Sequence, residues 1–166
     1  KIGGWAQLGD NTLTGRNTAL HHFVSSAGIK YAAIGTNRIL YVYSGGAFYD
    51  IHPIKATTTL TSAFTTTQSS KTVTITFASA HSITAGDIIK CDNFSSATNS
   101  NFAADDFNDV VFQVATIPTS TTLTITMDSA EAGSGASTSG GVRVKHYFPV
   151  GPAAEASAAG WGLGLW

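Results

Sequence analysis

Residues 33–54 read AIGTNRILYVYSGGAFYDIHPI and predict a β-hairpin. Two apolar runs, rich in aromatic and β-branched residues, flank the pair Gly45-Gly46. Glycine is the residue that best accepts the positive φ angles of a two-residue hairpin turn. Pro53 closes the second run, because proline has no N–H to give to a strand ladder. The stretch therefore predicts two antiparallel strands joined by a tight turn.

The hairpin belongs to a longer series of strand-like segments. Four such segments cover residues 19–26, 29–36, 38–45 and 47–54, with turn signals at Ala27-Gly28, Thr36-Asn37 and Gly45-Gly46. Strands that follow one another through short turns form an antiparallel meander, the arrangement of a β-propeller blade. No segment keeps helical periodicity over the ~11 residues of a typical helix. The best helix candidate, residues 17–26, is interpreted as a loop leading into a strand.

The residues from 57 to 148 predict a second module. This part is rich in threonine, and Val73, Ile75 and Phe77 alternate with it as in a strand with one buried face. Five short strands are expected, around 72–77, 85–94, 108–118, 120–129 and 140–148, with a turn at Gly86-Asp87. Such a set favours a small closed β-barrel or a β-sandwich.

The predicted fold class is therefore all-β. A propeller-blade-like antiparallel meander over residues 1–56 is followed by the small inserted β-module over 57–148. Residues 149–166, rich in Gly, Ala and Trp, are expected to be a connecting segment. Trp5, Trp161 and Trp166 are large apolar groups that are costly to leave in water, so we expect them at an interface between subunits or domains.

The composition favours a subunit of an assembly over a free monomer. Hydrophobic residues make up 43% of the chain and charged residues only 11%, whereas about 25% is usual in soluble domains. A surface poor in charge suits a protein covered by neighbours, and a secreted β-rich protein is the alternative. The formal charge of −1 gives no basic footprint for nucleic acid. No apolar run approaches the ~18 residues of a membrane span.

Two sulfur-containing residues carry further information. Cys91 is the single cysteine, so it cannot form an internal disulfide, and we interpret it as a buried apolar filler. Met127 is the single methionine and the chain begins with Lys1. The expectation is that this chain is a processed product or a segment of a longer polypeptide.

Candidate catalytic residues are few. His21 and His22 are adjacent, so in a strand they point to opposite faces and cannot chelate one ion together. Asp50 and His52 lie on one face, as in a base with an orienting carboxylate, but capping of a turn explains them better. His81 precedes a turn that an Asp side chain closes by bonding backbone amides.

Acidic residues offer the remaining chemistry. Asp105, Asp106 and Asp109 could bind a hard cation such as calcium, although their spacing does not match an EF-hand loop. Glu131 and Glu155, the only glutamates, lie in polar or Gly/Ala-rich loops. No GxSxG elbow, phosphate-binding loop or dinucleotide fingerprint occurs. We therefore expect no enzyme activity and no cofactor.

Three motifs resemble tailed-bacteriophage tail and neck structural proteins. The opening GGW with AIGT, LYVY, GG and YDI over residues 3–51 is similar to that family, in which Thr usually stands at the position of His52. Residues 72–148, from TVTITFASAHSITAGDIIKC through GGVRVKHYF, resemble a β-module recurrent in phage structural proteins, with Ser82-Ile83 in place of the usual Gly-Leu. The closing GWGLGLW resembles a Trp-Gly repeat that follows this module.

The resemblance is strongest to the nozzle proteins of short-tailed phages. It implies a virion protein built on a β-propeller with inserted β-modules, assembled as a six-fold homo-oligomeric ring. Such a ring would form or close the DNA exit channel, contact other tail proteins and touch DNA only in passage.

Two other functions stay open. A carbohydrate-binding β-module of a receptor-binding fibre or adhesin would use Tyr31, Tyr41, Tyr43, Trp5 and Trp161 as stacking faces. An enzyme such as a tail-associated depolymerase would draw its acids from Asp105, Asp106 and Asp109, without an evident acid–base pair.

Overall fold

A computed structural model of the protein describes residues 13–94, 102–128 and 142–149. The chain divides into two compact units. The first, here called the sheet unit, has residues 13–52 and Pro149 as its described part, and the second, the β-module, covers Pro53–Phe148. The fold is all-β, which confirms the predicted class. Within the described ranges the only helical element is a short 3-10 turn, η1 (Ala104–Asp106).

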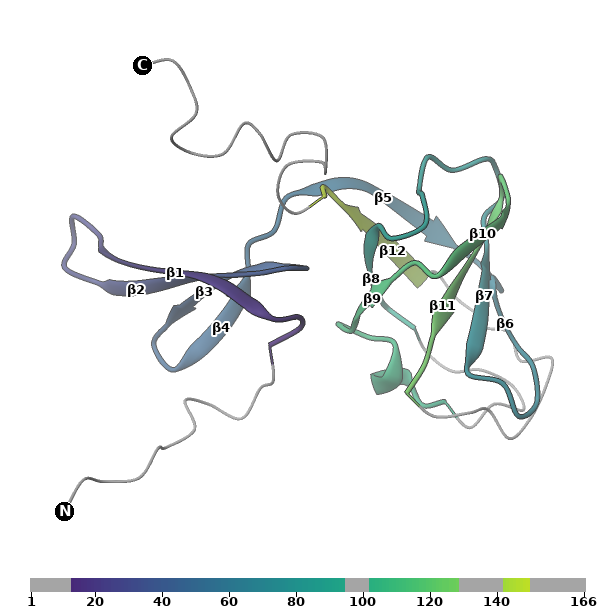
Figure 1. Ribbon diagram of the computed structural model, residues 1–166, viewed down its shortest axis with the longest axis horizontal. Helices are drawn as coiled ribbons and strands as arrows, with labels where there is room; N and C mark the ends of the chain where they lie inside the picture. Colours follow the sequence, from purple (N-terminus) through teal and green to yellow (C-terminus); the bar gives the residue numbers. More distant parts are fainter. Residues whose placement is uncertain (1–12, 95–101, 129–141, 150–166) are drawn as a thin grey trace. The chain divides into compact units, whose positions relative to one another are not determined.

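The sheet unit is one antiparallel meander. Its strands are β1 (Asn17–Val24), β2 (Lys30–Thr36), β3 (Leu40–Ser44) and β4 (Ala47–Asp50), and they lie side by side in sequence order (Figure 1). The predicted meander is confirmed. The first strand begins earlier than expected, because Asn17 already pairs with Thr36 before a bulge interrupts the register at Ala19.

Short turns close the meander. Gly45 and Gly46 join β3 to β4 with φ angles of 59° and 90°, a two-residue turn that side chains with a Cβ rarely adopt. Five residues, 25–29, separate β1 from β2, rather than the two of a tight hairpin turn. Gly28, with φ of 78°, donates its N–H to Ser25 O, and Ser25 N–H donates to Ile29 O. The turn between β2 and β3 is closed by Thr36, whose Oγ accepts the N–H of Ile39 at 2.8 Å.

The described residues of the β-module form two four-stranded antiparallel sheets. One has the order β10-β11-β7-β6 and the other β5-β12-β8-β9. Their strands are β5 (Ile54–Leu60), β6 (Phe64–Thr66), β7 (Thr72–Thr76), β8 (Ile88–Asp92), β9 (Val111–Gln113), β10 (Thr116–Thr119), β11 (Thr122–Thr126) and β12 (Val142–Tyr147). The sheets do not close into one ladder, so of the two predicted forms the closed barrel is wrong. Both sheets contribute to a single core, as in a sandwich.

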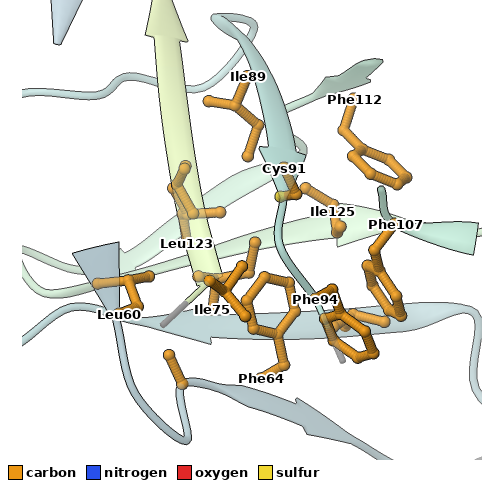
Figure 2. Packing of buried hydrophobic residues seen from close by; sticks show 14 of the residues in the cluster. Leu60, Phe64, Ile75, Ile89, Cys91, Phe94, Phe107, Phe112, Leu123 and Ile125 are labelled. Atoms are coloured by element: carbon orange, nitrogen blue, oxygen red, sulfur yellow. The ribbon is translucent and has the colours of Figure 1, made fainter. Parts of the chain in front are cut away.

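The core of the β-module joins an aliphatic layer to an aromatic cluster (Figure 2). Val73 and Ile75 of β7 lie opposite Ile125 and Leu123 of β11, and all four are fully buried. This burial follows from the sequences of β7 and β11, because period-two alternation directs their apolar residues inward and most of their threonines outward.

Phe107 is the centre of the aromatic cluster. Its ring stacks on Phe94 at 4.3 Å and meets Phe64 edge-on at 5.3 Å between centroids. Phe102 and Phe112 complete its surroundings. Offset-stacked and edge-on pairs are the arrangements that aromatic rings favour, so this corner of the module is packed like a protein interior.

Several strands differ from the sequence expectation. The described part of the β-module has eight strands where five were expected. β5 was missed because its Thr-rich sequence is exposed at six of its seven positions and so has no apolar alternation. The expected strand 108–118 is two strands, because Val114 leaves the ladder to exchange backbone hydrogen bonds with Gly86 and Asp87.

Candidate interaction surface

The sheet unit has two faces of different composition. Alternation along the strands and the cross-strand register separate them. The first, here called the Phe23 face, carries Ala19, His21, Phe23, Tyr31, Ala33, Gly35, Leu40, Val42, Ser44, Ala47, Tyr49 and Ile51. Among these described strand residues there is no Asp, Glu, Lys or Arg. Such a face is suited to contact with another apolar surface.

Large apolar side chains on the Phe23 face are open to solvent. Tyr49 is 56% exposed, Ile51 46% and Phe23 41%. The Phe23 ring stacks on Tyr31 with 5.1 Å between centroids and 15° between planes, so the two rings form one aromatic ridge across β1 and β2. Exposed apolar groups that gather in one place indicate an interaction site.

A shallow groove of about 540 Å³ crosses the Phe23 face. The stacked rings of Phe23 and Tyr31 line it together with Tyr49 and Ile51. The remaining lining residues are Val42, Ser44 and Gly45. Its lining is mostly apolar, and among the described residues the hydroxyls of Tyr31, Tyr49 and Ser44 are the only side-chain polar groups that line it.

The opposite side, here called the Tyr43 face, is also apolar but carries charge. It presents Leu20, His22, Val24, Lys30, Ala32, Ile34, Tyr41, Tyr43, Phe48 and Asp50. Leu20 is 54% exposed and Val24 62%. Tyr43 packs on Phe48 at 4.9 Å between centroids. Lys30 and Asp50 make this face less suited than the Phe23 face to burial against a purely apolar partner.

The sheet unit therefore has little core of its own. Among its described residues only Ile34, Thr36 and Ile39 are buried. A single sheet with two apolar faces normally lies between other layers, since each face must be shielded from water. The β-module, by contrast, buries its apolar residues between its own two sheets.

The β-module holds a small polar cavity of about 190 Å³, lined in part by His81, His146, Ser79 and Ser82. His146 is 3% exposed, and its Nε2 lies 2.9 Å from Asp87 Oδ2. His81 Nδ1 accepts the N–H of Ile83 at 3.3 Å, which leaves the ring proton on Nε2. That Nε2 is buried and has no hydrogen-bond partner among the described residues.

Asp87 stabilises the turn predicted at Gly86-Asp87. Its Oδ2 accepts the N–H of Thr84 at 2.9 Å, and Gly86 beside it has a φ of 93°. Asp87 and His146 are 59 positions apart in the sequence. No local pattern could have indicated this contact, which ties β12 to the turn before β8.

Asp92 is the centre of a network of ion pairs in the β-module. Its Oδ1 accepts the Arg143 Nε–H at 2.5 Å, and its Oδ2 lies 2.7 Å from Lys145 Nζ. Burial works against ionisation of Asp92, but hydrogen bonds and charges from both cations outweigh it and hold its pKa below the usual range. The neighbouring Cys91 is fully buried, and burial together with the Asp92 charge raises its thiol pKa to about 12. Cys91 is therefore a neutral thiol.

Two of the three acidic residues that could bind a cation, Asp106 and Asp109, have structural partners. Asp106 Oδ2 accepts the N–H of Ala103 at 2.7 Å and so caps η1. Asp109, with a positive φ of 61°, lies 3.2 Å from Lys90 Nζ. Asp105 is exposed on η1. In the described part of the chain no three His, Cys, Asp or Glu side chains are arranged to hold a metal ion.

The other candidates have simple placements. Asp50 Oδ1 accepts the backbone N–H of His52 at 2.9 Å, which caps the end of β4. Pro53 follows at the junction with β5, and its carbonyl accepts the N–H of Phe148. His21 and His22 point to opposite faces of β1. Trp5, Trp161, Trp166, Glu131 and Glu155 lie outside the described residues.

Comparison with known proteins adds little. No family model and no curated protein matches the chain. A solved structure to which the chain is similar is the phage phi92 endosialidase, with 19% sequence identity and a TM-score of 0.42. The alignment covers 80% of this chain and 19% of that one, so the chain spans about a fifth of that protein. A similarity this distant does not assign the activity of that protein to this chain.

Among the described residues no helix is long and apolar enough to cross a bilayer.

Proposed function

We propose that the chain is a structural subunit of a bacteriophage tail. The observation that carries this proposal is the sheet unit, a meander with exposed apolar residues on both faces and almost no core of its own. Such a sheet is stable when neighbouring sheets cover it, which is the situation of a blade in a ring-shaped wall. The motif resemblance of residues 3–51 to tail and neck proteins supports the same role.

Within that role, the finer proposal is a nozzle: a homo-oligomeric ring, six-fold in symmetry, that forms or closes the DNA exit channel. The low charge of the chain suits this position, because DNA that must pass through needs weak and mobile contacts. Other tail proteins would contact the ring, and Trp5, Trp161 and Trp166 are proposed as part of these interfaces. No catalytic step is assigned to the chain.

Labelling of virions tests the proposal. An antibody raised against the chain would be applied to intact virions whose genome encodes it, followed by electron microscopy. The expected result is label at the distal end of the tail, with six-fold symmetry in averaged end views. Label that is confined to unassembled protein in the lysate and absent from virions would contradict a structural role. Label on side fibres would contradict the nozzle and keep the tail location.

A second function, carbohydrate binding by a receptor-binding module, is favoured by one observation. The groove on the Phe23 face is lined by three aromatic rings, those of Phe23, Tyr31 and Tyr49. Aromatic faces beside hydroxyl groups are suited to the apolar side of a sugar ring. A glycan array probed with the chain tests this function, and the absence of binding to every glycan would count against it.

A further inference from the structure

We propose that the polar cavity of the β-module is a binding site for a small oxyanion, that is, a carboxylate or a phosphate group. The cavity of about 190 Å³ is lined by His81 and His146 together with the hydroxyl-bearing residues Thr58, Ser79 and Ser82. A cavity of this size is large enough for several waters or for a small organic anion. All of these residues lie in the β-module, so the inference goes beyond the proposed function and does not depend on it.

The cavity opens at the edge of a sheet. β5 is the edge strand of its sheet and pairs with β12 (Figure 1). Ala56 and Thr58 of β5 pair with His146 and Val144 of β12, and these two β12 residues are buried. The cavity therefore has a buried floor, and an anion can reach it across a rim of small, exposed residues: Ala56, Thr58, Ser79, Ala80 and Ser82.

His81 contributes a hydrogen-bond donor without an acceptor. Its Nδ1 accepts the N–H of Ile83, so the ring proton is on Nε2. That Nε2–H is buried and has no partner among the described residues, which costs free energy until an acceptor reaches it. The bond to Ile83 is long, at 3.3 Å, and holds the ring weakly. A small turn of the ring against Phe77, on which it packs at 4.8 Å between centroids, would direct Nε2–H to a bound oxygen.

His146 stands at a core position of β12. Val142 and Val144 precede it at alternate positions and are buried, and His146 is 3% exposed in the same row. Its Nε2 lies 2.9 Å from Asp87 Oδ2, which fixes a proton on that nitrogen. A polar ring in a row of valines costs free energy of burial, which polar partners must offset. Asp87 offsets part of this cost, and a polar ligand in the cavity would offset more of it.

The donor set selects the class of ligand. The polar side chains of the lining are two imidazoles and three hydroxyls, and none of them is an acceptor only. No Asp or Glu among the described residues lines the cavity, and Asp87 binds His146 without being part of the lining. A carboxylate or phosphate group offers several acceptor oxygens to such donors, whereas water brings two donors of its own that need acceptors.

Nuclear magnetic resonance of the full chain with ¹⁵N-labelled histidine rings tests the inference. The chain is titrated with sodium acetate or with sodium phosphate, at fixed pH and with the ionic strength held constant by sodium chloride. The expected result is a saturable shift of the His81 and His146 ring signals in the millimolar range. His21 and His22 of β1 are internal controls whose signals should not move. Saturation by acetate alone would assign the site to carboxylates, and saturation by phosphate alone would assign it to phosphates.

His81→Phe removes the Nε2–H and keeps an aromatic ring beside Phe77. It is expected to weaken binding by about 10-fold or more, the effect of losing a hydrogen bond to a charged group. His22→Phe is the matched control, because His22 is exposed on β1, and its dissociation constant should equal that of the unmodified chain. Circular dichroism checks that each variant keeps its strands. If His81→Phe unfolds the β-module, Ser82→Ala on the exposed rim takes its place and is expected to weaken binding by about 2–5-fold.

Three results would overturn the inference. Signals of His81 and His146 that stay in place with both anions up to about 100 mM would mean that the cavity holds water alone. Equal shifts of the His22 signal would show a general ionic effect. An unchanged dissociation constant in His81→Phe would show that the anion binds elsewhere. None of these results changes the labelling of virions, so the proposed function would stand.

Discussion

The two units of the chain bury apolar surface in opposite ways. The β-module keeps Ile75 at 0% exposure in its core, whereas the sheet unit leaves Phe23 at 41% exposure on an open face. Both are large apolar residues on strands of antiparallel sheets, Ile75 on β7 and Phe23 on β1. The difference shows that alternation alone does not create a core; a second layer must be present to receive the apolar face. The β-module carries its second layer, whereas the described residues of the sheet unit form one layer only.

The largest expected effect comes from removing the centre of the module's core. Phe107→Ala is expected to lower the free energy of unfolding of the β-module by about 3–5 kcal/mol, through lost contacts and a residual cavity. Phe23→Ala is the matched control, and in dilute solution it should cost less than about 1 kcal/mol. Urea denaturation followed by circular dichroism measures both. Equal losses in the two variants would remove the distinction between the units.

The charged network predicts a smaller, pH-dependent effect. Because the pKa of Asp92 is lowered in the folded state, its stabilising contribution is present above the unfolded pKa of about 3.9 and is lost as pH falls through the folded value. Asp92→Asn is expected to cost about 1–3 kcal/mol at pH 7, the range for hydrogen bonds to charged groups. The variant should also lose part of the acid sensitivity. Urea titrations at pH 7 and pH 3 measure this, and an unchanged pH dependence in Asp92→Asn would contradict the assignment.

A turn in the sheet unit gives an effect of about the same size or less. Gly46→Ala should destabilise that unit by about 1 kcal/mol, because its φ of 90° is strained for a residue with a Cβ. Gly35→Ala is the control, since a Cβ there would lie 3.5 Å from the Ala19 Cβ, an ordinary contact. Thermal melts of both variants compare them. A Gly35→Ala loss as large as that of Gly46→Ala would show that the φ angle is not the cause.

The last prediction concerns the reactivity of Cys91, which tests whether the core of the β-module stays closed to solvent. A fully buried thiol with a pKa raised to about 12 should not react with a thiol reagent at pH 8 while the protein is folded. In urea above the unfolding transition it should react at the rate of a free cysteine. Fast labelling of the native chain would mean that the β-module opens readily, contrary to the sharp contrast between the units.

The sequence allowed the elements with strong local signals to be predicted. The meander, the Gly45-Gly46 turn region and the apolar alternation of Val73 and Ile75 all depend on residues close together in the chain. β5 escaped prediction because an exposed edge strand of threonines needs no apolar alternation. The pairing of His146 with Asp87 escaped because it joins residues 59 positions apart.

The candidate surface was only partly foreseeable. The low charge content indicated a covered surface, and Tyr31 was already a candidate for stacking. The groove could not be predicted, because it depends on the register that brings Tyr49 opposite Val42 and Phe23 opposite Tyr31. A shift of one residue in either pairing would move those rings to the other face.

Hydrogen exchange tests the central contrast most directly. Mass spectrometry of the dilute chain would compare amides of β1–β4 with those of β7 and β11, which lie in the middle of a sheet in the β-module. The account predicts exchange at least about 100-fold slower in β7 and β11 than in β1–β4, together with slower exchange in β1–β4 when the chain is concentrated. Equal protection of the two units in dilute solution would contradict it, because the sheet unit would then be stable without a neighbour.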